Sequence, residues 1–151
     1  MYYCREASEQ DISSMVLLLK QLTEIEVDFH FNAEAHYDGL ELLIESAQAM
    51  VVVAVNNEND QVIGMCTGQL TISTAEGGNS LLIDDVVVNE KFRGNGIGAG
   101  MLNYLQKKSN EKFGLKRMQL CADVENDKAL KFYEKGQWQR TNFVLLRKMV
   151  D

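Results

Sequence analysis

The 151-residue sequence contains no proline, and its cysteines are few and widely spaced. Without proline the chain cannot contain a polyproline linker. The three cysteines, Cys4, Cys66 and Cys121, form no C-x-x-C pair, which argues against a disulfide framework and against a zinc site. We therefore expect no bound metal, and thiols that stay reduced, as is usual in the cytoplasm.

Long apolar runs are missing as well. The apolar run at residues 50–55 is far shorter than the roughly 20 residues that cross a bilayer. Residues 1–6 lack the apolar core of a signal peptide. No repeat or low-complexity tract divides the chain, and its 17.0 kDa suit one domain. We expect a single cytoplasmic domain over residues 1–151 that does not interact with membranes.

Charge is unevenly distributed along the chain. The formal net charge of −7 disfavours nucleic acid and anionic membranes as partners. Residues 21–45 contain seven carboxylates and no Lys or Arg, whereas residues 91–117 contain seven basic side chains and one Glu, a local +6. The acidic stretch could attract a cation and the basic stretch a polyanion, or both could simply solvate helix surfaces.

Residue periodicity predicts a mixed α/β domain. A helix that follows an N-cap at Ser8 is expected to extend to about residue 22. The other helices are expected at residues 33–48, 97–113 and 126–135, and the strands at residues 2–5, 51–55, 62–72, 81–88, 118–122 and 143–149. The second and third strands should form an antiparallel hairpin. The strand, helix and strand over residues 81–122 should form a right-handed crossover with parallel strands.

A glycine-rich segment precedes the helix at residues 97–113. Glycines between a strand and a helix expose backbone N–H groups where the helix dipole favours phosphate. A P-loop is excluded because Ala99 and Gly100 stand where Lys and Ser or Thr are required. Gly94, Gly96 and Ala99 satisfy a dinucleotide fingerprint literally, but no acidic residue follows at the expected distance.

Two segments carry a resemblance to a known family. Residues 86–98 read V-V-V-N-E-K-F-R-G-N-G-I-G, which resembles the acetyl-CoA loop of the GNAT superfamily of N-acetyltransferases. Residues 126–133 read N-D-K-A-L-K-F-Y, which is similar to the N-x-x-A-x-x-F-Y helix of the same family. One departure is Lys135-Gly136-Gln137-Trp138, where the family pattern K-x-G-F has its glycine one place later.

The resemblance implies both a fold and a reaction. The expected fold is the α/β acyl-CoA N-acyltransferase fold, in which a mixed, mostly antiparallel sheet splays between two parallel strands and carries about four helices. The implied activity is transfer of an acetyl group from acetyl-CoA to a primary amine by direct attack. The implied cofactor-binding residues are Val86, Val87, Val88, Arg93, Gly94, Asn95, Gly96, Ile97, Gly98, Asn126 and Tyr133.

The resemblance also suggests catalytic residues. Tyr133 matches the tyrosine that assists the leaving thiolate. Asp84 and Asp85 are candidates to accept the amine proton. As neighbours on one strand they should face opposite sides, so only one can face the cleft. Residues 83–88, I-D-D-V-V-V, are similar to a segment of glucosamine 6-phosphate N-acetyltransferases, which favours Asp85, although either residue could instead order a turn.

The sequence does not identify the amine that accepts the acetyl group. The acidic stretch favours a cationic small molecule or peptide, such as a polyamine, an aminoglycoside or a lysine side chain. An amino-sugar phosphate is the alternative that residues 83–88 suggest, and a non-catalytic acyl-CoA sensor is another. His30 and His36 lie where this family often builds its acceptor site. Many members of this family form dimers, so the resemblance also implies a possible homodimer.

Overall fold

The computed structural model describes residues 1–26 and 28–151, which divide into two compact units, Met1–Leu120 and Cys121–Asp151. Each unit is described separately, and a single domain over the whole chain stays a prediction. The strands of the first unit are β1 (Tyr2–Glu6), β2 (Ala49–Asn56), β3 (Val62–Ser73), β4 (Gly78–Val88) and β5 (Leu115–Leu120). Its α-helices are α1 (Ile12–Ile25), α2 (Ala33–Glu45) and α3 (Ile97–Phe113), and the second unit contains α4 (Asp127–Lys135).

The five strands form one mixed sheet in the order β1-β2-β3-β4-β5. The first three pairings are antiparallel and the pairing of β4 with β5 is parallel, which confirms the predicted hairpin and the predicted parallel strands on either side of α3. The parallel ladder runs from Asn79 and Leu115 to Ile83 and Leu120, whereas β4 continues to Val88. Among the described strands, only β3 therefore lies beside the last five residues of β4.

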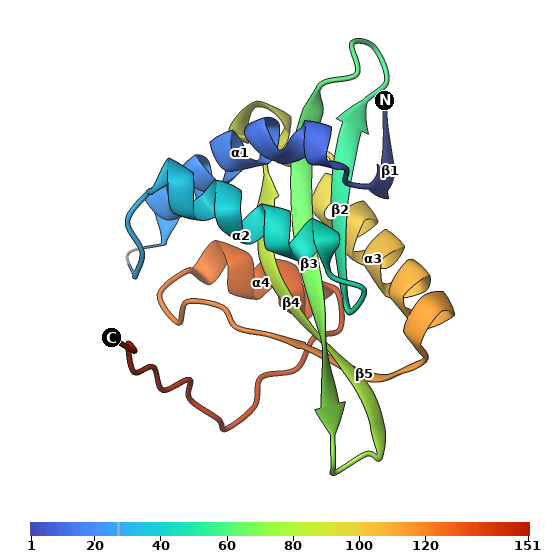
Figure 1. The fold of residues 1–151 in the computed structure, drawn as a ribbon, viewed down its shortest axis with the longest axis vertical. Helices are drawn as coiled ribbons and strands as arrows, with labels where there is room; N and C mark the ends of the chain where they lie inside the picture. The colour runs from blue at the N-terminus through green and yellow to red at the C-terminus, as the bar shows by residue number, and fades with distance from the viewer. Residues whose placement is uncertain (27) are drawn as a thin grey trace. The chain divides into compact units, whose positions relative to one another are not determined.

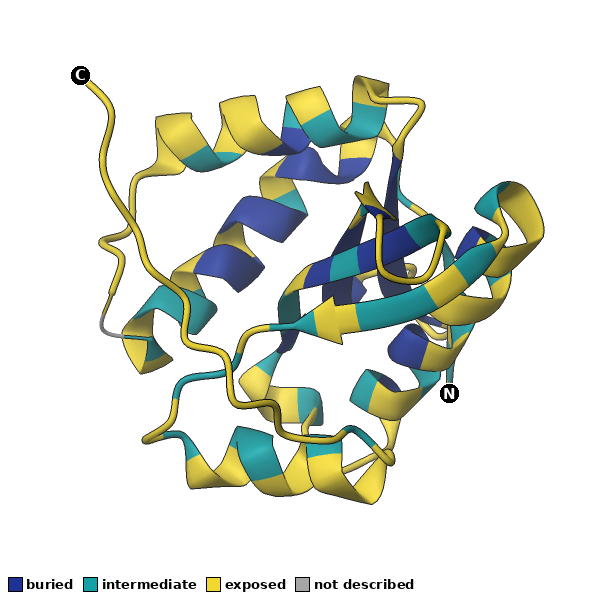
Figure 2. Ribbon diagram, turned by 90° about the horizontal axis from the view of Figure 1, so that it is seen from below, coloured by how far each residue is buried: buried dark blue, intermediate teal, exposed yellow. Residues whose placement is uncertain are grey.

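Helices cover both faces of this sheet. Figure 1 shows α1 and α2 crossing one face and α3 lying behind the strands. On the first face, Val51 and Val53 of β2 join Met15 of α1 in the core. On the second face the Sγ of Cys66 lies 3.9 Å from the Met101 carbonyl of α3. Because both faces are covered, every residue of β2 is buried and its sequence is almost uninterruptedly apolar (Figure 2).

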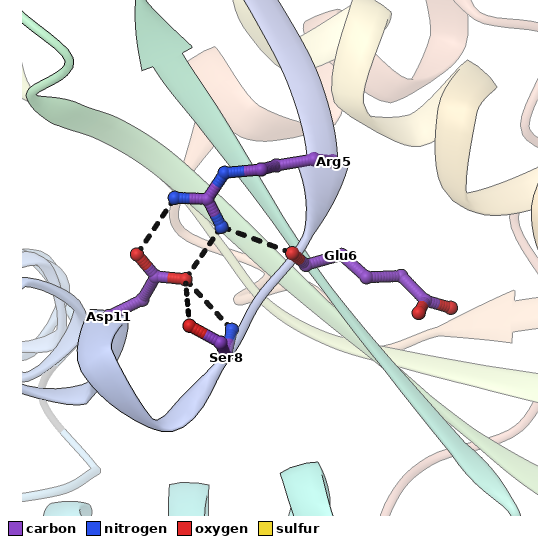
Figure 3. Close-up of polar contacts among 4 residues, drawn as sticks. All are labelled: Arg5, Glu6, Ser8 and Asp11. Carbon is purple, nitrogen blue, oxygen red and sulfur yellow. Dashed lines mark hydrogen bonds and ion pairs between the residues drawn. The ribbon is translucent and has the colours of Figure 1, made fainter.

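An ion pair fixes the path from β1 into α1 (Figure 3). The guanidinium of Arg5 donates to both carboxylate oxygens of Asp11, at 2.7 and 3.0 Å. Asp11 also accepts the backbone N–H of Ser8 at 2.8 Å, so the N-cap expected at Ser8 is present at the start of a short 3-10 turn, Glu9–Asp11. Hydrogen bonding from Arg5 holds the pKa of the Asp11 carboxyl below its usual value, and burial partly opposes this.

Some predicted boundaries are wrong. The second helix ends at Glu45 rather than residue 48, and β5 occupies Leu115–Leu120 rather than residues 118–122. Residues 143–149 form no strand, although they are apolar enough to predict one. Their side chains, such as Phe143 and Leu146, are almost fully exposed. An apolar extended segment becomes a strand only when a neighbouring strand supplies backbone hydrogen bonds, and composition cannot supply that partner.

Within the described ranges, no helix has the length and apolar character needed to cross a membrane.

Candidate active site

Asp85 lies at a β-bulge between β3 and β4, just beyond the point where the ladder of β4 with β5 ends. Met65 pairs with Val87 and Thr67 with Asp84, so Cys66 of β3 faces two residues of β4. Asp85 adopts a φ of 54°, in the left-handed region that few residues other than glycine enter. The bulge interrupts the regular alternation of side chains at this point, so alternation alone does not decide which of Asp84 and Asp85 faces the cavity.

The bulge directs the Asp85 carboxylate toward the sheet face covered by α1 and α2. Thr67 lies on that face, and its hydroxyl is 3.0 Å from Oδ2 of Asp85 and 3.2 Å from the Asp84 carbonyl. Burial and the neighbouring Asp84 raise the pKa of Asp85 to about 6, although the Thr67 hydroxyl partly offsets them. Near neutral pH, Asp85 is therefore a carboxylate with raised basicity.

A cavity of about 480 Å³ opens beside this carboxylate. The described residues that line it include Asp85 but not Asp84. They are Leu19 of α1; Ala35, His36, Gly39, Leu40, Leu42, Leu43 and Ser46 from α2 and its C-cap; Gln69 of β3; and Asp85 of β4. Burial also raises the pKa of Asp84, and the Asp85 N–H partly offsets this. Of the two predicted carboxylates, Asp85 is the one that borders a space large enough for a small molecule.

Val88 presents backbone groups to the open edge of β4. Asn89 donates its N–H to the Ile63 carbonyl at 2.8 Å, and Gly64 pairs with Val88. Because hydrogen-bonding direction alternates along an antiparallel strand, the N–H and C=O of Val88 point away from β3. The Val88 carbonyl accepts the Nε–H of Arg93 at 2.8 Å, which ties the following loop to the strand. The parallel ladder with β5 has ended before this point.

The glycine-rich loop ends at the N-terminus of α3. Gly94 and Gly96 have φ values of 80° and 78°, and a Cβ at either position would meet no atom within 4 Å. Asn95 donates to the Phe92 carbonyl at 2.9 Å, which orders the loop. Gly100 donates to Gly96 and closes the first helical turn, so the N–H groups of residues 97–99 have no acceptor within the helix. Such N–H groups favour a phosphate.

The remaining predicted residues lie in the second unit. Asn126 is the N-cap of α4 and accepts the N–H of Ala129 at 3.1 Å. The ring of Tyr133 contacts the rings of Phe132 and Trp138 at centroid distances of 5.1 and 6.1 Å. Asn126 thus has the helix-capping role that its position predicts, and Tyr133 stands in an aromatic cluster of its own unit.

The sequence analysis missed several residues of the cavity. Gln69 on β3 and the leucines of α1 and α2 carry no motif, although helical periodicity places leucines on one helix face. Thr67, which does not line the cavity but donates to Asp85, carries no motif either. His36 lines the cavity, its ring 5.3 Å from that of Phe31, whereas His30 is exposed and is not among the described lining residues.

Comparison with known proteins identifies related sequences and folds. The model of the acetyltransferase (GNAT) family matches residues 19–137. No curated protein matches the chain.

Solved structures share the fold at low sequence identity. A transcriptional regulator from Bacillus halodurans C-125 is 22% identical with a TM-score of 0.85, over 99% of this chain and 100% of that one. A possible acetyltransferase from Clostridium difficile 630 is 20% identical with a TM-score of 0.85, over 100% and 99%. Glucosamine-6-phosphate N-acetyltransferase from Arabidopsis thaliana is 21% identical with a TM-score of 0.77, over 100% and 99%. At identities of 20–22%, these likenesses show a shared fold alone.

Proposed function

Because this chain belongs to the GNAT family of acetyltransferases, we propose that it transfers an acetyl group from acetyl-CoA to a primary amine by direct attack. The observation that carries this proposal is the arrangement along one continuous segment. The cavity carboxylate of Asp85, the outward N–H of Val88 and the phosphate-type loop before α3 follow one another within 15 residues.

The loop fits the diphosphate of a coenzyme A. Gly94 and Gly96 hold backbone conformations that direct the chain around a tight turn, and the space beside both is open. The free N–H groups of residues 97–99 supply hydrogen bonds at the positive end of the α3 dipole. Arg93 and Lys91 add positive charge. When bound, acetyl-CoA supplies an acetyl thioester that an amine can attack.

The open edge of β4 fits the remaining part of such a ligand. Residues 86–88 can pair their outward backbone groups with the amides of a pantetheine arm. The Val88 N–H would then polarise the carbonyl that is attacked, and a preorganised donor in that position contributes about 10²–10³ in rate.

Asp85 is the proposed acceptor for the proton of the incoming amine. An alkylammonium with a pKa near 10.4 is almost fully protonated at pH 7, so it must lose a proton before it attacks. The raised pKa of Asp85, about 6, makes it a better base than an ordinary carboxylate while it remains ionised at neutral pH. Transfer can be direct or pass through a water in the cavity.

Two residues of the second unit complete the proposal. Tyr133 hydrogen-bonds or protonates the leaving thiolate, and Asn126 contacts the pantetheine arm, as the family resemblance implies. Both assignments rest on the N-x-x-A-x-x-F-Y match.

Gly96→Val tests the loop assignment. The branched side chain at a positive φ should block the approach of a diphosphate to the α3 N-terminus and lower acetyl-CoA affinity by at least about 10²-fold. The matched control is Gly77→Val in the β3–β4 turn, where φ is 72° and the space is equally open. Calorimetric titration with acetyl-CoA measures the affinity of both variants, and the control should bind as tightly as the wild type.

Unchanged acetyl-CoA affinity in Gly96→Val would contradict the loop assignment.

Measuring thiol release from acetyl-CoA over a panel of amines separates an enzyme from a sensor. Acetyl-CoA binding without amine-stimulated thiol release would mean that the chain senses an acyl-CoA and does not transfer the acetyl group.

A further inference from the structure

The cavity beside Asp85 combines one carboxylate with an apolar wall. Leu19 of α1 and Leu40, Leu42 and Leu43 of α2 form that wall. Asp85 is the one carboxylate among the described lining residues, and none of these residues is Lys or Arg. A ligand that fits here needs one positive charge close to Asp85 and an apolar body.

The acidic stretch does not change this conclusion. None of the seven carboxylates of residues 21–45 is among the described residues that line the cavity. They can raise the local concentration of a cation near the entrance, but a second ammonium inside the cavity would find no second carboxylate among the described lining residues. Burying an unpaired charge costs much more than burying a methyl group.

A phosphate group fits the cavity no better. Tight phosphate binding in proteins uses Arg, Lys or clustered backbone N–H groups. The polar groups of the described lining are the Asp85 carboxylate, the Gln69 amide, the Ser46 hydroxyl and the His36 imidazole. A phosphate in this volume would also face the negative charge of Asp85.

We propose that the acceptor is a primary amine whose single ammonium is carried by an apolar carbon stem, with the ammonium at Asp85 and the stem along the leucines of α1 and α2. This inference rests on the proposed acetyl transfer and names its acceptor class. A free alkylamine and a lysine side chain share this chemistry. Polyamines, aminoglycosides and amino-sugar phosphates lack it.

A matched pair of amines tests the class directly. n-Hexylamine and 1,5-diaminopentane contain the same number of non-hydrogen atoms and differ in whether the far end is a methyl or an ammonium group. Thiol release from acetyl-CoA should show n-hexylamine to be the better substrate, with a kcat/KM higher by at least about 10²-fold. Glucosamine 6-phosphate should be at least as poor as the diamine. Nα-acetyl-lysine amide, in a further arm, distinguishes a lysine source from a free alkylamine.

A cavity variant tests whether this pocket makes the choice. Leu42 lines the cavity, yet its side chain is 69% exposed, so Leu42→Glu should fold. The added carboxylate should favour the diamine and shift the ratio of the two kcat/KM values toward it by about tenfold. Leu17→Glu on α1 is the control, because Leu17 is 64% exposed and is not among the described lining residues.

The possible results separate the two proposals. Preference for the diamine or for glucosamine 6-phosphate would overturn the acceptor class and leave the acetyltransferase proposal intact. An unchanged amine ratio in Leu42→Glu would show that another surface selects the acceptor, which also overturns it. Acetyl-CoA binding without thiol release for any amine would refute the proposed function itself.

Discussion

At the scale of single residues, both the backbone conformation and the carboxylate environment of Asp85 are energetically unfavourable. Its backbone has a positive φ, and its carboxylate is partly buried beside Asp84. Strain of this kind persists where the surrounding structure enforces it, and it concentrates at functional sites. Because Asn tolerates the left-handed region best after glycine, Asp85→Asn removes the charge without changing the backbone requirement.

We expect Asp85→Asn to lose most acetyl transfer and yet to be the more stable protein at pH 8. The carboxyl titrates near 3.9 when unfolded and at about 6 when folded, so ionisation costs the native state stability as pH rises from 4 to 6. Removing it should increase the free energy of unfolding at pH 8 by on the order of 2 kcal/mol, with no gain at pH 4. Urea unfolding at both pH values measures this.

In the wild type, the same pKa predicts that kcat/KM falls as pH drops through about 6. This fall is the acidic limb of the pH profile of kcat/KM. Besides Asp84 and Thr67, the groups near Asp85 are His36 in the cavity and the buried Cys66. Thr67→Val removes the hydroxyl donor and should move the limb to higher pH, whereas Thr67→Ser should leave it in place. If kcat/KM of the Asp85→Asn variant still falls over the same pH range, a group other than Asp85 causes the fall.

Gln137 is a second strained residue, and here the strain has no evident use. Its φ is 69°, at the position where the family pattern K-x-G-F has glycine. Glycine adopts this conformation without a Cβ clash. Gln137→Gly should therefore stabilise the protein by about 1 kcal/mol, measured as a higher urea midpoint. A lower midpoint would show that the side chain compensates for the strain.

At the scale of elements, the Arg5 and Asp11 pair connects β1 to the start of α1. Asp11 is buried and has four donors around it, the two guanidinium N–H groups of Arg5 and the N–H and hydroxyl of Ser8. Its role is to orient the helix whose Leu19 contributes to the cavity wall. Removing Arg5 would leave a buried carboxylate without its partner, and removing the charge of Asp11 would leave the partly exposed Arg5 guanidinium without its counter-ion.

Asp11→Asn should lower the free energy of unfolding at pH 7 by about 2–3 kcal/mol. The folded pKa of Asp11 lies below its usual value, so the wild-type pair stabilises the protein above about pH 4 and loses that contribution as pH falls through the folded pKa. The difference between variant and wild type should thus shrink at pH 2–3. Urea unfolding across this range measures it, and a constant difference would assign the loss to packing instead of charge.

At the scale of the whole molecule, the chain carries its motifs in two compact units. The carboxylate, the open strand edge and the glycine loop belong to residues 1–120, whereas Asn126 and Tyr133 belong to residues 121–151. The family match runs from residue 19 to 137 and so includes parts of both. The proposed reaction needs both, because the leaving thiolate requires a hydrogen-bond donor.

Tyr133→Phe tests this requirement. Loss of the phenolic hydroxyl should lower kcat by about 10²-fold or more, with little change in acetyl-CoA affinity, because the hydroxyl acts on charge that develops in the transition state. Tyr104→Phe on α3 is the control, since Tyr104 has no proposed role. Steady-state kinetics and calorimetry separate the two effects, and an unchanged kcat would refute the assignment.

Residues close together in the sequence were enough to predict most helices and strands and the glycine-rich loop before α3. Glycine conformations, caps such as Asn126 and the apolar periodicity of helices and strands depend on neighbouring residues in the chain, so they can be read before folding. The parallel direction of β4 and β5 follows from the helix that connects them, because a helical crossover returns the chain to the same end of the sheet. The family motifs lie on these same local features.

Long-range pairing settled what local patterns left open. The bulge opposite Cys66 directs Asp85 into the cavity, and it depends on how β3 registers against β4. The same pairing turns the Val88 N–H to the open edge, whereas residues 143–149 form no strand in the described chain. Register, burial and raised pKa values arise from residues far apart in sequence, and only their meeting in three dimensions defines them.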